Sequence, residues 1–115
     1  KELLANIEGN DLLLLESNHD IEMLRVGPYP WPLKKRIMGD RGHLSNEMAA
    51  KVIAYLAEKG CRNFILGHLS RENNFPELAY QTTFNALTEK KIAVGQDVFL
   101  EVASRDRAGK VQILE

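Results

Sequence analysis

The sequence has a single cysteine, no long apolar run and no excess of charge of either sign. With Cys61 alone, no disulfide can form within the chain, which favours a reducing compartment and therefore a cytoplasmic location. The longest apolar run, Val52 to Ala57, is far too short to cross a bilayer, so no contact with a membrane is expected. Fifteen Lys and Arg against 16 Asp and Glu give a net charge of −1, which argues against broad electrostatic binding of nucleic acid but not against a local basic patch.

Several familiar motifs of nucleotide and metal binding are also missing. The chain has no Walker loop, no glycine-rich dinucleotide fingerprint, no GxSxG and no paired cysteines that would suit zinc. Its three histidines are scattered through different predicted elements and do not by themselves predict a metal centre. A function must therefore come from residues that the fold brings together.

Apolar runs alternate with amphipathic segments, which predicts an α/β domain with a largely buried sheet. The segment PYPWP, residues 28–32, holds three prolines and is expected to be irregular. A chain of 115 residues suits one domain, and its predicted first helix has no cap, so we expect residues 1–115 to be a single partial domain. We expect helices over residues 1–9, 20–27, 33–39, 46–59 and after Pro76, buried strands over 12–17 and 62–66, and a tail hairpin of 98–104 with 110–114.

Polar residues follow both predicted buried strands at their carboxyl ends, where α/β sheets bind ligands. Glu16 ends the first strand within ESNHD, and a carboxylate at such a position often serves in acid–base chemistry. The alternative is that this cluster caps the following helix, a role that suits Asp20 better than Glu16. The sequence leaves the role of His19 undecided.

The tetrapeptide GHLS occurs twice, at 42–45 and 67–70, in two different contexts. His68 leaves a buried strand, where it can hold a metal or catalytic group, or merely bond the next loop. His43 comes just before the helix cap Ser45, a position that favours an anion such as phosphate. For His43 the residues alone favour the plainer alternative, a loop histidine.

Basic and aromatic residues suggest contacts with a phosphodiester. The run LKKR at 33–36, Arg41 and Arg71 are candidate phosphate contacts, and Tyr29 and Trp31 are candidates for stacking on a base. Taken singly, each of these side chains is better explained as part of a solvated face or as a lid on the core.

Two stretches together resemble a known family: LLLLESNHDIEMLRVGPYPWPLKKRIMGDRGHLSNEMAA and FILGHLSRENN. They resemble the carboxyl-terminal half of a metallo-β-lactamase-fold hydrolase of the YycJ/WalJ type, from about Asp11 to Asn85. The resemblance implies the second half of an αββα sandwich, an α/β structure with a mixed sheet and flanking helices.

The resemblance also implies roles for three residues. His68 in LGHLS matches the last metal ligand of the family, while Glu16 and His43 match a pair that assists proton transfer at the scissile phosphate. The implied cofactors are two divalent metal ions, zinc or manganese, with most ligands from an HxHxDH segment that this chain does not contain.

The expected function is a metal-dependent phosphodiesterase, a DNA exonuclease, of which this chain supplies the second half and is inactive alone. Expected partners are the upstream half of the same domain, DNA or another phosphodiester, and a second copy of the chain. Two alternatives stay open: a non-catalytic α/β interaction or regulatory module, and a hydrolase of small phosphodiesters.

Overall fold

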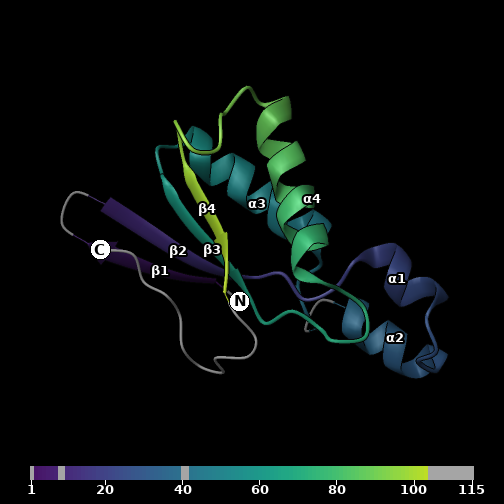
Figure 1. Ribbon diagram of the computed structural model, residues 1–115. Coiled ribbons are helices and arrows are strands. Elements are labelled where there is room, and N and C mark those ends of the chain that lie inside the picture. The colour runs from purple at the N-terminus through teal and green to yellow at the C-terminus, as the bar shows by residue number, and fades with distance from the viewer. Residues whose placement is uncertain (1, 8–9, 40–41, 104–115) are drawn as a thin grey trace.

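A computed structural model describes residues 2–7, 10–39 and 42–103 of the chain (Figure 1). Four helices and four strands lie within these ranges, and they alternate largely as the sequence predicts. In chain order the elements are β1 (Glu2–Ile7), β2 (Asn10–Glu16), α1 (Ile21–Val26), α2 (Trp31–Met38), α3 (Asn46–Glu58), β3 (Asn63–Gly67), α4 (Pro76–Glu89) and β4 (Phe99–Val102). None of the helices in these ranges is long and apolar enough to cross a membrane.

The four strands form one mixed sheet in the order β1-β2-β3-β4. β2, β3 and β4 are parallel, and β1 pairs antiparallel with β2. The predicted α/β class with a mixed sheet is therefore confirmed. The register pairs Glu16 with Gly67, so the carboxyl ends of β2 and β3, which the sequence singled out, lie side by side.

The predicted helix over residues 1–9 is wrong, because Glu2–Ile7 is strand β1. All six of its residues pair with β2, from Glu2 opposite Leu15 to Ile7 opposite Asn10. A short helix of about two turns is marginal in isolation, so ladder bonds to a neighbouring strand outweigh the local helical preference.

The core lies between one face of the sheet and the two long helices α3 and α4 (Figure 1). Side chains of β2 and β3 meet those of the helices there, and each of the largest is at most 1% exposed: Leu13, Leu15, Phe64, Leu66, Ile53 and Leu87. Burying a side chain of this size contributes about 1.5–3 kcal/mol, so this layer supplies much of the stability that holds the strand ends in place.

Helix α3 begins where the sequence predicts and turns a slightly different face to the core. Ser45 caps it, because the Met48 amide donates to Ser45 Oγ at 3.0 Å. The helical spacing predicts an apolar face of Met48, Val52, Ile53 and Leu56. Met48 is instead 47% exposed, whereas Ala49 and Ile53 are fully buried. Small alanines let α3 approach the sheet closely, and this rotates Met48 toward solvent.

Helices α1 and α2 form a pair beyond the carboxyl ends of β2 and β3 (Figure 1). α2 already starts at Trp31, so the prediction that the whole of residues 28–32 is irregular is wrong for its last two residues. Pro32 sits in the first helical turn, where a missing amide hydrogen costs nothing. In the tail, β4 confirms a strand within residues 98–104, whereas its expected partner at 110–114 lies outside the described residues.

Candidate active site

Glu16 and His43 form a direct pair at the end of the sheet. His43 Nδ1 lies 2.5 Å from Glu16 Oε2, across 27 residues of sequence. The Glu16 side chain is only 10% exposed, while that of His43 is 53% exposed. One partner is thus anchored in the protein and the other faces solvent, which is the arrangement expected of a group that must reach a ligand.

The pair also fixes which ring nitrogen of His43 is available. An ionised carboxylate only accepts hydrogen bonds, so Nδ1 donates to Glu16. Nε2 is then left to accept a proton in the neutral ring or to donate one in the charged ring. A carboxylate that orients an imidazole in this way is a common device of general acid–base sites.

The loop that carries His43 packs tightly on the end of α2. The His43 amide donates to the Ile37 carbonyl at 3.0 Å, and the Gly42 amide donates to the Gly39 carbonyl at 2.9 Å. A Cβ at Gly42 would lie 2.2 Å from the Ile37 carbonyl oxygen and 2.4 Å from that of Arg36. No side chain fits this approach, so glycine is required to bring His43 to Glu16.

His68 occupies the same edge of the sheet, directly after β3. Its imidazole is exposed, and its backbone φ of 57° lies in the left-handed region, which few residues other than glycine adopt. Asn18 holds this turn from two sides: its side-chain amide donates to the His68 carbonyl at 2.9 Å, and its own carbonyl accepts from the Ser70 amide at 2.7 Å. A strained position held by specific bonds is typical of functional sites.

The residues of this chain do not complete a metal centre. Among residues 2–7, 10–39 and 42–103, no group of three His, Cys, Asp or Glu side chains is placed to hold a metal ion. An exposed imidazole at a rigid strand end is suited to be one metal ligand. His68 can therefore contribute one ligand to a metal site but cannot form the site alone.

The remaining predicted contact residues are spread around this edge. Arg71 is exposed in the loop after β3, so its role as a phosphate contact stays a prediction. Arg41 lies outside the described residues. Trp31 is 60% exposed at the start of α2, and Tyr29 is half-buried in the loop before it.

A buried amide network beneath the pair was not foreseen from the sequence. Ser17 Oγ donates to Asn46 Oδ1 at 2.6 Å, and the side chains of Asn46 and Asn74 bond each other reciprocally at 2.9 Å. Asn74 also donates to the Ser17 carbonyl at 2.9 Å. These residues tie the end of β2, the start of α3 and the loop after β3 into one unit. These hydrogen bonds join segments that are far apart in the sequence. Isolated asparagines in a sequence carry no signal that predicts such bonds.

His19, undecided from the sequence, is 2% exposed and belongs to this scaffold. Its carbonyl accepts from the Asn46 amide at 2.7 Å, and its Nδ1 lies 3.3 Å from Asn18 Oδ1. Burial, together with the nearby charge of His43, lowers the pKa of His19 below its usual value, against opposing effects of Glu16 and Asp20. His19 is therefore held as a neutral, structural histidine.

The lowered pKa of His19 predicts acid sensitivity of the fold. Between the folded pKa and the unfolded value of about 6.5, the unfolded chain binds more protons, so stability rises with pH there. The free energy of unfolding should have its full value above about pH 6.5 and should fall as the pH drops below this value. Urea unfolding of the full-length protein at a series of pH values, with His19→Gln as the comparison, measures the effect.

Glu47 acts in the opposite direction, because burial raises the pKa of its carboxyl, helped by Asp20 and opposed by backbone hydrogen bonds. Its contribution is common to the wild type and His19→Gln, so the difference between the two profiles isolates His19. Parallel profiles for the two proteins would contradict the assignment.

The comparisons with known proteins point to nucleases. The chain is 44% identical over 102 residues to the exodeoxyribonuclease WalJ of Streptococcus pneumoniae, in strains D39 and R6 alike, a match that covers 89% of this chain and 38% of the relative. It is also 44% identical over 90 residues to the exodeoxyribonuclease YycJ of Bacillus anthracis, which covers 78% of this chain and 34% of the relative.

The chain thus spans little more than a third of the length of these relatives. No protein-family model matches it, and no solved structure gives a significant match. Glu16, His43 and His68 were selected from the sequence through a resemblance to this same type. The identity over most of the chain confirms that resemblance: this chain is a relative of the exodeoxyribonucleases of the WalJ/YycJ type.

Proposed function

We propose that this chain is part of a metal-dependent phosphodiesterase that degrades DNA as an exonuclease. The observation that carries the proposal is the Glu16–His43 pair, with Nδ1 and Oε2 2.5 Å apart at the carboxyl ends of adjacent parallel strands. The names of the relatives, exodeoxyribonucleases, support this reaction class and DNA as the substrate.

In this function, Glu16 is the positioning residue and His43 is the proton-handling residue. The nearly buried carboxylate keeps the imidazole in one tautomer and one orientation. Nε2 then faces the scissile phosphodiester, where it moves a proton at a phosphate oxygen or at the leaving oxygen.

His68 supplies one ligand to a site that holds two divalent ions, zinc or manganese. When bound, such ions polarise the phosphate and lower the pKa of an attacking water. The other ligands come from the rest of the full-length protein, because the described part of this chain offers no complete set. The length of the relatives leaves ample chain for them.

The partners of this chain follow from its incomplete set of metal ligands. The chain completes an αββα sandwich of the metallo-β-lactamase type by docking with an upstream segment, or associates with a second copy when that segment is missing. Residues 1–115 alone are inactive, since their described part holds no complete set of metal ligands. A cytoplasmic location accords with the single cysteine.

The test is an assay of the full-length protein on end-labelled DNA. We expect stepwise release of nucleotides from a strand end, abolished by a chelator and restored by zinc or manganese. Full activity in excess chelator would show that the reaction does not need a metal ion. An absence of any nuclease activity, with metal present and the protein folded, would overturn the proposed function as a whole.

A further inference from the structure

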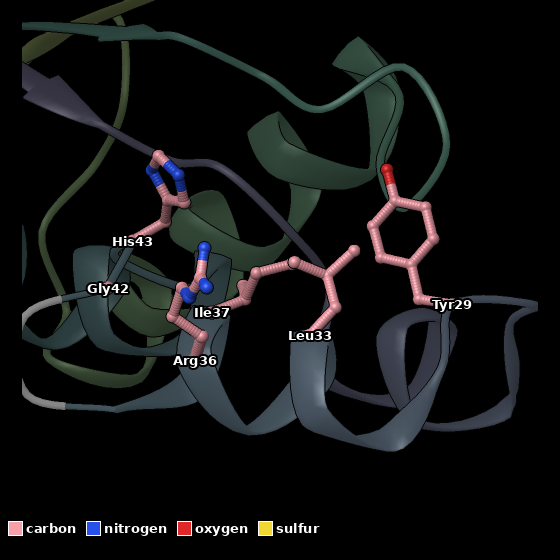
Figure 2. Close-up of a pocket in the computed structure, with 6 residues that line it drawn as sticks. All are labelled: Tyr29, Leu33, Arg36, Ile37, Gly42 and His43. Carbon is pink, nitrogen blue, oxygen red and sulfur yellow. The ribbon is translucent and has the colours of Figure 1, made fainter.

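His43, the exposed member of the Glu16–His43 pair, forms part of the wall of a pocket. The pocket has a volume of about 300 Å³ and is lined by Tyr29, Leu33, Arg36, Ile37, Gly42 and His43. This volume is at the lower end of the range for small-molecule sites, about 300–1,000 Å³. Figure 2 shows Tyr29 at one end of the pocket and His43 at the other, with Arg36, Leu33 and Ile37 rising from α2 between them.

The lining combines the three chemistries that a nucleotide requires. Leu33 and Ile37, one helical turn apart on α2, give an apolar floor. Tyr29 offers an aromatic face, on which any base can stack. Arg36 offers a guanidinium, whose planar fork matches a phosphate better than the point charge of a lysine does.

Arg36 is available for such a ligand. Within residues 2–7, 10–39 and 42–103 no acidic side chain forms a salt bridge with it, whereas Arg25 on the neighbouring helix is paired with Glu22 at 2.8 Å. The position of Arg36 is defined by its helix, which is tied to α1 by a hydrogen bond from Lys34 Nζ to the Arg25 carbonyl at 2.5 Å. Because Arg36 has no acidic partner among the described residues, its guanidinium is suited to bind an anion in this pocket.

The pocket is also rigidly connected to the Glu16–His43 pair. The close approach of Gly42 to the α2 carbonyls and the bond from the His43 amide to Ile37 fix α2 and His43 relative to each other. A strand whose scissile phosphate lies at His43 would therefore pass Arg36 on its way to Tyr29, in the order that Figure 2 shows.

We propose that this pocket binds one nucleotide of the DNA strand, next to the phosphodiester that is cleaved, with its phosphate on Arg36 and its base against Tyr29. The inference rests on the proposed nuclease function for its substrate, DNA. It extends that function with a binding site built entirely from α2 and the loops on either side of it.

The test uses four variants of the full-length protein in matched pairs. Tyr29→Leu removes the stacking face, and Tyr55→Leu removes a tyrosine that is 58% exposed on α3, away from the pocket. Arg36→Gln removes the cation of the pocket, and Lys51→Gln removes an exposed charge on α3 whose side chain does not line it. Thermal unfolding first confirms that all four are folded.

Affinity for a fluorescent single-stranded DNA decamer is measured by anisotropy in chelator, and KM and kcat are measured with metal. Tyr29→Leu and Arg36→Gln should each weaken binding about tenfold, as expected for the loss of one stacked base and of one charged contact to phosphate, respectively. The effect should appear in KM more than in kcat, and the two controls should stay within about twofold of the wild type. With an abasic residue at the terminal nucleotide, Tyr29→Leu should lose its effect while Arg36→Gln keeps it.

Wild-type affinity and KM in both pocket variants would overturn this inference and leave the nuclease function standing. An equal loss with the abasic strand would overturn the placement of the base on Tyr29. Tighter binding of the matching RNA decamer would overturn the assignment to DNA. A protein that binds the decamer through Tyr29 and Arg36 but never cleaves it would support the pocket and overturn the nuclease function.

Discussion

Replacing His43 with Ala in the full-length protein is expected to lower DNA turnover about 100- to 10,000-fold, the range that general acid–base groups supply. The reason is geometric. His43 is the exposed member of the pair, and its Nε2 is the ring nitrogen that the bond to Glu16 leaves available. Bound metal should remain unchanged in this variant, because His43 Nδ1 is engaged by Glu16 and His43 belongs to no cluster of metal-ligating side chains in the described ranges. Initial rates and elemental analysis of the same preparation measure both quantities.

Glu16→Gln is the matched variant for this prediction. It keeps an acceptor for Nδ1 and removes the charge, so turnover should fall less than in His43→Ala. The double variant should be no slower than His43→Ala alone, because residues that act as one unit are not additive. Normal turnover in His43→Ala would end the assignment of the pair to proton transfer.

Asn46→Leu is expected to destabilise the protein by on the order of 3 kcal/mol. Asn46 is fully buried and bonds both Ser17 and Asn74. Leucine has the same number and branching of side-chain heavy atoms but no polar atoms. The Ser17 hydroxyl and part of the Asn74 amide therefore lose their partners, and each unsatisfied group costs about 1–3 kcal/mol. The free energy of unfolding in urea measures the loss.

Asn85→Leu provides the control on the surface of α4. Asn85 accepts a bond from Gln81 at 2.9 Å in an exposed position, so its replacement should change stability by no more than about 0.5 kcal/mol. Equal urea midpoints of unfolding for Asn46→Leu and Asn85→Leu would show that the buried network does not stabilise the protein.

The elements with a strong local pattern were predictable from the sequence. The apolar run within 12–17 indicated β2, Ser45 marked the start of α3, and Pro76 marked the start of α4. β1 could not be found in the same way, because its conformation is set by pairing with β2 and not by its own periodicity.

The site, too, depends partly on local sequence patterns and partly on contacts between segments that are distant in the sequence. Glu16 and His68 were candidates from their positions at strand ends, whereas His43 received its role from the family resemblance. Their common location depends on the parallel register of β2 and β3, which pairs Glu16 with Gly67. The pocket was harder still, since Tyr29 and Arg36 taken singly favoured plainer roles. Only the packing of the Gly42 loop on α2 brings them to His43.

The most direct test of the central claim is the metal content of the full-length protein, measured by elemental mass spectrometry alongside its nuclease activity. We expect about two divalent ions per chain in the wild type, consistent with two-metal phosphodiesterases. His68→Ala should clearly lose bound metal, together with activity. A metal-free wild-type protein that degrades DNA at full rate, or undiminished metal in His68→Ala, would contradict the assignment of His68 as a metal ligand of a nuclease.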